Sequence, residues 1–430
     1  MPTWITDIAS LVVVPPGPLS GERARDIERI ADAAVRIEDG KIAWFGAARG
    51  AAIEPGAERL SAAGGCVIPG LIDSHTHLPF AGERSGEFRR RLAGESYEAI
   101  MRAGGGIRVT HAAVRAASEA SLVAQNLPRL ERMLAHGVTT CECKSGYGLS
   151  VEHELKQLRT IRALASRQPL ELVPTFLGAH ALPAEFEGRP DAYLDEVASD
   201  AVFETLARER LAAFCDVFCE TVAFSVEQSR RVLARARRAG LKLKLHADQL
   251  AQIGASRLAA ELGATSADHL EQIDEAGIAA LRDAGTIATV LPGCTFFLGA
   301  PHADARRMLA AGLPVAVATD LNPGSAHVES LPLVMNIACC QMRMSIEETL
   351  VACTANAAAA LDLHHRLGAI AVGFDADLVA LDCAHLAEWL YSPGRNRVRK
   401  VLKRGRLVLD QAGRQAGPWH GPSEDPAASG

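Results

Sequence analysis

Strand-sized apolar runs alternate with stretches of helical spacing through the middle of the chain. Eight such runs occur within about 300 residues, which is in the size range of a TIM barrel. They are Val67–Asp73, Gly137–Glu142, Glu171–Leu177, Phe214–Phe218, Leu241–Leu245, a short run ending at Ala267, Ile287–Leu291 and Pro314–Ala318. Alternating strands and helices predict parallel βαβ units, and eight units predict an α/β fold of the (β/α)8 TIM-barrel type.

Several of the predicted helices carry their own end signals. Ser225 with Gln228, and Ser345 with Glu348, have the spacing of a capping box, in which each residue satisfies a backbone N–H of the other. We expect the second of these helices to run into Ala355. The signals place helix starts between the predicted strands and favour the alternating order.

Both ends of the chain have the alternating pattern of β-strands. Asp39-Gly40 lies between two such strands near the start, and Arg404-Gly405 lies between two near the end, as expected for two-residue hairpin turns. Each β segment is too small to be stable alone. We therefore expect residues 1–66 and 365–412 to form one small β-sandwich domain beside a barrel of residues 67–364.

Side chains suited to chemistry follow seven of the eight predicted strands. In a TIM barrel the carboxyl ends of the strands form the face that carries the site. Polar residues also follow strands simply because the chain enters a loop there. That accounts for one or two histidines, but not for histidines at four of eight strand ends. The residues are His75, His77, Lys144, Tyr147, His180, Glu220, His246, His269 and Asp320.

His75-Thr76-His77 is the strongest of these motifs. Alternate residues of a strand face the same way, so both imidazoles can bind one metal ion. The alternative is a pair of buried, hydrogen-bonded histidines. His246 and Asp320, at two further strand ends, favour the metal, because three imidazoles and one carboxylate suit Zn²⁺ or a similar ion. Such a metal lowers the pKa of a bound water toward about 7.

Two residues are candidates for proton transfer. We expect His269 to act as an acid–base or electrostatic group beside the metal, although it could instead only orient a ligand. Asp320 can bind the metal, accept the proton of an attacking water and deliver it to a leaving nitrogen.

Composition and charge exclude several classes of protein. With 45 basic and 51 acidic residues and a net charge of −6, the chain has no basic block suited to nucleic acid or an anionic membrane. No apolar run reaches the ~18–20 residues of a membrane span, and no secretory signal is evident before Pro15. Ten cysteines without a CxxC pair predict reduced thiols and a cytoplasmic location. Residues 413–430, rich in Gly, Pro and Ser, predict a flexible tail.

The first strand end resembles a known signature. The segment Pro69–His77 is similar to the first-strand motif of the amidohydrolase superfamily. Further segments resemble one family within it, the imidazolonepropionases of histidine degradation, and the resemblance runs from about Val67 to Leu409. These segments are Phe80–Arg84, Ala103–Ile107, Lys144–Gly148, Thr175–His180, Asp216–Glu220, His246–Gln249, Ser266–His269 and Thr319–Ser325.

This resemblance implies a hydrolase that opens the cyclic amide of 4-imidazolone-5-propanoate to give N-formimidoyl-L-glutamate. It implies one metal ion per chain, for which we favour Zn²⁺ with Fe³⁺ as the alternative. The implied ligands are His75, His77, His246 and Asp320. The partner is then a small molecule with a carboxylate tail. The sequence does not give the oligomeric state, and a homodimer is consistent with an enzyme of this size.

The resemblance also implies a set of substrate contacts. Arg84 suits the carboxylate tail, since a guanidinium can hold a carboxylate through two parallel hydrogen bonds; taken alone it reads as a solvated loop arginine. Gln249 stands where the family carries Glu or Gln. An amide cannot titrate, so we expect it only to hydrogen-bond the ring. The full set is Arg84, Tyr97, Tyr147, His180, Gln249, Asn322, Gly324 and Ser325.

Other interpretations remain at this point. The chain could be a metal-dependent amidohydrolase or deaminase that acts on another small heterocycle, because TIM barrels change substrate by loop variation. A non-enzymatic relative would have no need for the four metal ligands that this chain keeps. Glu220, or a modified Lys144, could bridge a second metal, whereas the family resemblance implies that both only support other residues.

Overall fold

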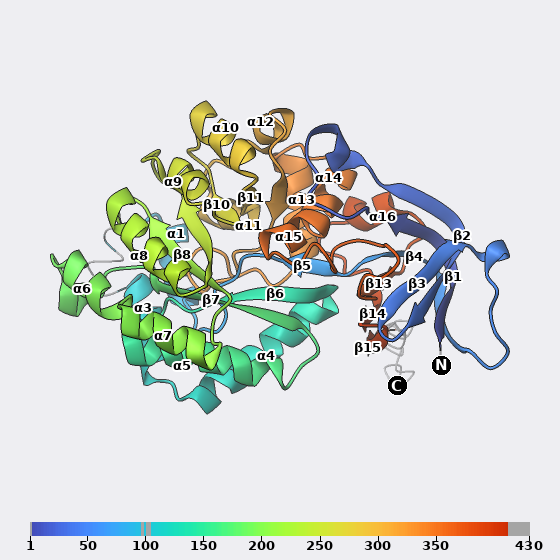
Figure 1. Cartoon of the computed structure of the whole chain (residues 1–430), viewed down its shortest axis with the longest axis horizontal. Coiled ribbons are helices and arrows are strands. Elements are labelled where there is room, and N and C mark those ends of the chain that lie inside the picture. The colour runs from blue at the N-terminus through green and yellow to red at the C-terminus, as the bar shows by residue number, and fades with distance from the viewer. Residues whose placement is uncertain (1, 96–98, 100–104, 412–430) are drawn as a thin grey trace, which may run out of the picture.

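The computed structural model describes residues 2–95, 99 and 105–411. Within that part of the chain, two sheets form two structural units that lie side by side along the long axis (Figure 1). Tyr97 and the predicted tail lie outside the described residues.

An eight-stranded sheet forms the larger unit, in the order β12-β11-β10-β9-β8-β7-β6-β5. All of its strand pairs are parallel, which confirms the predicted TIM barrel. Between the segments after β5 and β12, Asp320 N–H donates to His75 O at 3.0 Å and His77 N–H to Leu321 O at 2.9 Å, which closes the barrel. The strands are β5 (Leu71–Asp73), β6 (Val138–Lys144), β7 (Glu171–Ala179), β8 (Phe214–Cys219), β9 (Lys242–Ala247), β10 (Ser266–His269), β11 (Ile287–Val290) and β12 (Val315–Val317).

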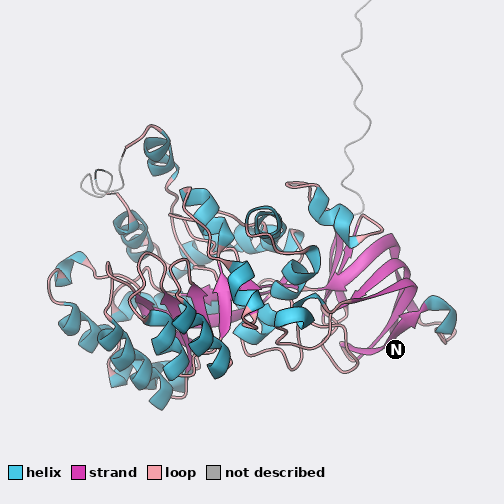
Figure 2. Cartoon of the chain, turned by 90° about the horizontal axis from the view of Figure 1, so that it is seen from above, coloured by secondary structure: helices cyan, strands magenta, loops and turns pink. Residues whose placement is uncertain are grey.

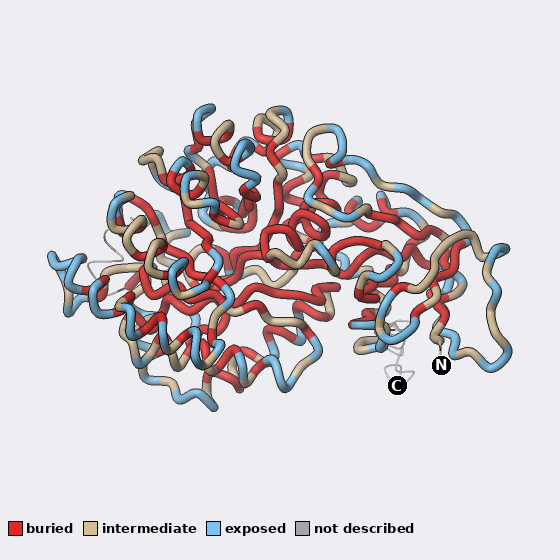
Figure 3. The backbone as a smooth tube through the Cα atoms, viewed as in Figure 1, coloured by how far each residue is buried: buried red, intermediate tan, exposed pale blue. Residues whose placement is uncertain are grey.

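Helices surround this barrel, and the strands they cover are almost wholly buried (Figures 2 and 3). The helices are α1 (Ser85–Leu92), α3 (Ile107–Ala116), α4 (Glu119–Ala135), α5 (Val151–Ala165), α6 (Pro190–Val197), α7 (Asp200–Glu209), α8 (Val226–Arg238), α9 (Ala255–Glu261), α10 (Glu275–Ala284), α11 (Pro292–Leu298), α12 (Ala305–Ala310), α13 (Leu331–Gln341), α14 (Ile346–Ala352), α15 (Ala355–Ala360) and α16 (Leu386–Tyr391). Among the described residues, no helix is both long and apolar enough to cross a bilayer.

Both predicted capping boxes are present. Ser225 and Ser345 exchange reciprocal hydrogen bonds with Gln228 and Glu348 at the starts of α8 and α14. The prediction that the second of these helices runs into Ala355 was wrong, because α14 ends at Ala352. Thr354 has φ −131° and ψ −90°, outside the helical region, so the chain turns there and a separate helix begins.

The predicted strand Val67–Asp73 is divided between the two sheets. The strand β4 (Glu58–Pro69) belongs to the small sheet, where it pairs with β1 (Thr3–Val13), and only β5 belongs to the barrel. Gly70 stands at the crossover, and a Cβ atom on it would lie 2.4 Å from Thr139 Oγ1. The apolar run is continuous across the crossover, so the sequence pattern does not show where the chain passes from one sheet to the other.

The two chain ends build the second sheet, as predicted. Its order is β15-β14-β13-β4-β1-β2-β3, one continuous mixed sheet with its own apolar cluster. Both predicted hairpin turns are present: Asp39 and Gly40 have φ 51° and 77°, and Arg404 and Gly405 have φ 47° and 72°, as a type I′ turn requires. The remaining strands are β2 (Glu28–Glu38), β3 (Lys41–Ala47), β13 (Leu378–Leu381), β14 (Val398–Lys403) and β15 (Arg406–Asp410).

Candidate active site

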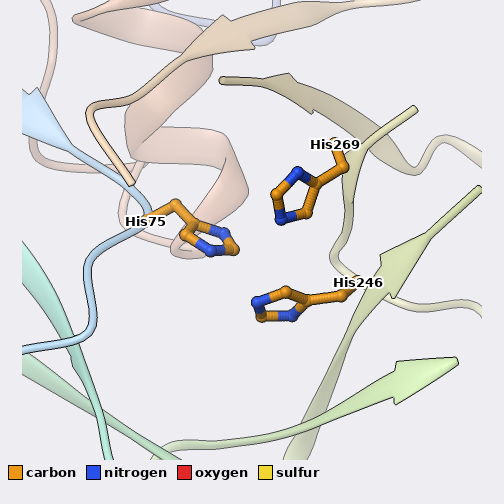
Figure 4. A group of neighbouring side chains, drawn as sticks. All are labelled: His75, His246 and His269. Carbon is orange, nitrogen blue, oxygen red and sulfur yellow. The ribbon is translucent and has the colours of Figure 1, made fainter. Parts of the chain in front are cut away.

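Three histidines from separate strand ends point toward one another at the carboxyl end of the barrel (Figure 4). His75 follows β5, His246 lies on β9, and His269 ends β10. Their ring centres are 4.6 Å (His75–His246), 5.2 Å (His246–His269) and 5.7 Å (His75–His269) apart. Since parallel strands all end on the same face, residues nearly 200 positions apart meet there.

His77 and Asp320 complete a tight group of ligand atoms with His75 and His246. His77 Nε2 lies 3.3 Å from His75 Nε2, 3.4 Å from His246 Nε2 and 3.2 Å from Asp320 Oδ1. His75 Nε2 is 3.5 Å from Asp320 Oδ1. All four side chains are buried. The structure therefore brings together the four residues predicted as metal ligands.

The second ring nitrogen of two of these histidines faces a buried carboxylate. His75 Nδ1 donates to Asp268 Oδ2 at 2.6 Å, and His246 Nδ1 lies 2.9 Å from Asp216 Oδ2. With Nδ1 protonated, each Nε2 carries a lone pair directed into the group. Burial lowers the pKa of His246 to about 4 and that of His75 well below its ordinary value, so both rings are neutral.

The donor set fits a metal ion. Four ligand atoms at about 2.0–2.2 Å around a tetrahedral ion lie about 3.3–3.6 Å apart, close to the separations seen here. Asp320 Oδ1 is buried and has no hydrogen-bond partner among the described residues. Lone pairs packed this closely repel one another unless a cation lies between them. Three imidazole nitrogens and a carboxylate oxygen are ligands that zinc accepts.

His269 differs from the other histidines in its electrostatics. Burial disfavours its charged form, but the carboxylates of Glu271, Asp320 and Asp268 outweigh burial and raise its pKa. Its Nδ1 lies 3.6 Å from Glu271 Oε1. A charged imidazole has no lone pair for a metal and can donate hydrogen bonds, which favours an acid or electrostatic role. His269 has φ 80° and Asp320 φ 56°, unusual values that cluster at functional sites.

Lys144 and Lys244 lie in a buried ionic cluster beneath the ligand group. Lys144 Nζ is 2.8 Å from both Glu142 Oε2 and Asp216 Oδ2, and Lys244 Nζ is 3.0 Å from Glu142 Oε1. The two ammonium groups already supply positive charge among these carboxylates. Lys144 therefore supports Asp216, in agreement with the family resemblance.

Glu220 is occupied in a different way. Its carboxylate accepts the backbone N–H groups of Thr221, Leu250 and Ala251 at 2.7, 2.8 and 3.2 Å. These bonds fix the loop that follows Gln249, which is partly buried after β9. Glu220 thus holds a loop rather than joining the ligand group.

Comparison with known proteins identifies the family. The sequence model described as "Amidohydrolase family" matches residues 66–408. The imidazolonepropionase of Symbiobacterium thermophilum is 44% identical over 412 residues, covering 95% of this chain and 97% of that protein. The chain belongs to the imidazolonepropionase family. The imidazolonepropionase of Myxococcus xanthus is 46% identical over 395 residues, covering 91% and 93% of the two chains.

Solved structures share the fold of this chain at much lower sequence identity. A zinc-bound adenosine deaminase from Xanthomonas campestris superposes with a TM-score of 0.73, at 19% identity, covering 95% of this chain and 93% of that one. The guanine deaminase of E. coli superposes with a TM-score of 0.70, at 15% identity, covering 96% and 99%. At such identities they establish only the shared architecture.

Two of the residues predicted to contact substrate in this family adjoin the ligand group. His180 stacks on His77 with ring centres 5.0 Å apart, and the Tyr147 ring lies 5.4 Å from that of His180. His180 Nδ1 donates to Gly146 O at 2.9 Å, which leaves its Nε2 free to accept a hydrogen bond. Position 146 favours glycine for two reasons: its φ is 110°, and a Cβ atom there would lie 3.0 Å from Leu177 O.

The loop after β12 is built by its own side chains. Asn322 Oδ1 accepts the N–H groups of Gly324 and Ser325, each at 2.8 Å, and Asn322 Nδ2 donates to Asp320 O at 2.7 Å. Asn322 is therefore engaged in shaping the loop, while Arg84 lies against Gly324.

Asp216 and Asp268 contact the candidate ligand histidines, and the sequence pattern does not single them out. Both lie within segments that carry the family resemblance, Asp216–Glu220 and Ser266–His269, but neither was predicted as a site residue. The available signal is an acidic residue inside a buried strand, which requires a partner. The identity of that partner depends on which strands are neighbours, and only the fold supplies it.

Proposed function

We propose that this chain hydrolyses 4-imidazolone-5-propanoate to N-formimidoyl-L-glutamate. The convergence of His75, His77, His246 and Asp320 on one buried point carries the proposal. Its support is the 44% identity to curated imidazolonepropionases over nearly the whole chain. The alternative of a deaminase acting on another heterocycle rests only on structural neighbours at 15–19% identity.

We place one metal ion on His75, His77, His246 and Asp320. Zinc suits the three nitrogens and one oxygen, with Fe³⁺ as the alternative. When bound, the metal supplies a Lewis acid that lowers the pKa of water toward about 7 and polarises a carbonyl. Asp216 and Asp268 keep the imidazoles oriented toward it.

The protein groups handle the protons of the ring opening. Water adds to the ring carbonyl carbon while the Asp320 carboxylate accepts its proton. Asp320 then returns that proton to the ring nitrogen as the C–N bond breaks, which leaves the formimidoyl nitrogen protonated and a carboxylic acid that releases the second proton of the water to solvent. His269, in the charged form that its carboxylate neighbours favour, donates to the developing oxyanion.

Substrate orientation falls to residues around this centre. Arg84 holds the carboxylate tail of the substrate. Tyr147 and His180, whose rings lie beside that of His77, contact the imidazolone ring of the substrate. Gln249 hydrogen-bonds the ring without titrating. Gly324 and Ser325 present the loop backbone and hydroxyl near Arg84, with Asn322 shaping that loop.

We infer a cytoplasmic location from the thiols. All ten cysteines of the chain are free, and eight of them are buried. Protein thiols persist in a reducing compartment, whereas an oxidising one favours disulfides.

The test follows the ultraviolet absorbance of freshly generated 4-imidazolone-5-propanoate with zinc-loaded protein. We expect fast loss with the wild type. His246→Ala should lower the rate by more than about a hundredfold, because even outer-shell partners of a metal are worth about 10–100-fold. His365→Ala, an exposed histidine far along the chain, is the matched control. Background loss with a folded, zinc-bearing wild type would reject the proposal.

A further inference from the structure

The Arg84 guanidinium is bound by a neighbouring carboxylate on one of its edges. Nε and Nη2 donate to Glu87 Oε2 at 3.0 and 2.7 Å. Both side chains are mostly buried, with 13% and 16% of their surface exposed. A pair so shielded from water is better ordered than an exposed surface ion pair.

Glu87 is itself fixed from two sides. It occupies the first turn of α1, three residues after Arg84, and its second oxygen, Oε1, accepts the N–H of Gly106 at 3.0 Å. The carboxylate thus ties α1 to the start of α3, whose N-cap is Gly106. An anchor held in this way can determine the orientation of the guanidinium that binds it.

The other edge of Arg84 faces the loop after β12. A Cβ atom on Gly324 would lie 2.2 Å from Arg84 Nη1 and 3.1 Å from Cζ, so the guanidinium rests directly on the Gly324 backbone. Neither bond to Glu87 uses Nη1. A guanidinium has five N–H donors and can therefore serve two carboxylates on two different edges.

We propose that Glu87 is a positioning residue for substrate recognition: it holds one edge of Arg84 so that the Nη1 edge, lying over Gly324, receives the carboxylate tail of the substrate. The inference rests on the proposed function for the identity of that substrate. Glu87 touches no substrate atom and acts through Arg84. The opposite arrangement, in which Glu87 competes with the substrate for Arg84, predicts the reverse effect on affinity.

Kinetics of Glu87→Gln separate these arrangements. Loss of the Glu87 charge weakens its hold on Nε and Nη2 and frees the Arg84 guanidinium. We therefore expect KM to rise about tenfold, which corresponds to one charge-assisted pair, while kcat changes less than about twofold. In an Arg84→Gln background the second substitution should add nothing to KM. An unchanged or lowered KM would overturn the inference, and a lowered one would indicate competition.

Glu95→Gln is the matched control. Glu95 also binds the Nε and Nη2 edge of an arginine, accepting from Arg90 Nε at 2.6 Å on Oε2 and from Nη2 at 2.5 Å on Oε1, just beyond the end of the same helix. Loss of the charge of Glu95 at Arg90 should leave KM unchanged. A rise in KM equal to that of Glu87→Gln would mean that α1 is merely destabilised, which also overturns the inference.

A binding measurement keeps the result independent of turnover. Calorimetry compares 3-(imidazol-4-yl)propanoate with 4-propylimidazole, which has the ring but no carboxylate. We expect Glu87→Gln to weaken the first about tenfold and to leave the second unchanged. If the wild type binds the carboxylate probe through Arg84 yet hydrolyses no imidazolone, the proposed reaction fails and the role of Glu87 stands. If Glu87→Gln weakens both probes equally, or if the wild type prefers neither, the inference fails.

Discussion

A histidine that presents one ring nitrogen to a metal needs a partner for the other nitrogen. His246 on β9 finds its partner in Asp216 on the adjacent strand β8, whereas His75, which follows β5, finds its partner in Asp268 on β10, a strand that is not its neighbour. The ligands are evident in the sequence because they stand at strand ends. The partners are not, since an acidic residue within a strand says nothing about which imidazole it will meet.

Asp268→Asn tests this arrangement at the scale of one residue. The amide keeps the shape but loses the charge that fixes the His75 tautomer, so we expect zinc affinity to fall about 10–100-fold. Competition with a chromophoric chelator measures it without reference to turnover. Asp283→Asn, an exposed carboxylate, should leave the affinity unchanged. Wild-type affinity in Asp268→Asn would show that the contact is incidental.

At the scale of elements, the crossover at Gly70 shows how close packing decides where a strand changes sheet. Residues on either side of it belong to β4 and β5, and Thr139 of β6 occupies the space where a side chain would be. The apolar run on both sides is uniform, so the pattern predicts one strand. The change of direction is visible only when both sheets are assembled.

Gly70→Ala should destabilise the fold. A Cβ atom would lie 2.4 Å from Thr139 Oγ1 and 2.7 Å from Cγ2, in a buried place, and overpacking of this kind costs about 1–3 kcal/mol. Thermal unfolding at a fixed scan rate measures the effect. Thr139→Ala removes both of these atoms, so the double variant should recover part of the loss. Simple addition of the two costs would contradict the packing explanation.

At the scale of the whole molecule, charged and polar contacts fasten the small sheet and its connections to the barrel. Glu171 on β7 pairs with Arg366 and with Lys403 of β14. Asn356 of α15 accepts from Leu19 N at 2.7 Å and donates to Leu19 O at 2.9 Å. These contacts join residues more than 190 positions apart, so no local sequence pattern predicts them.

The Glu171 contacts predict an acid-sensitive junction. Burial disfavours the charged carboxylate, but Arg366 and Lys403 outweigh it and hold the pKa of Glu171 below its ordinary value. A lowered folded pKa stabilises the protein above the unfolded pKa of about 4.3, and that stability is lost as pH falls through the folded pKa.

Glu171→Gln should therefore cost about 1–3 kcal/mol near pH 7 and progressively less below about pH 4. The measurement is the difference between the thermal midpoints of wild type and variant across this pH range. Loss of metal in acid affects both proteins alike and cancels in the difference. A difference that does not change with pH would show that the charge contributes nothing to the junction.

The sequence alone determined the eight barrel strands, the two hairpin turns, the capping boxes and the four residues that converge as candidate ligands. Each of these depends on local periodicity, turn chemistry or position at a strand end, which neighbouring residues encode. Tertiary structure alone decided the division of a strand at Gly70, the pairing of Asp268 with His75 and the hold of Glu87 on Arg84 over Gly324. Those features depend on which atoms occupy the same space, and only the assembled barrel fixes that.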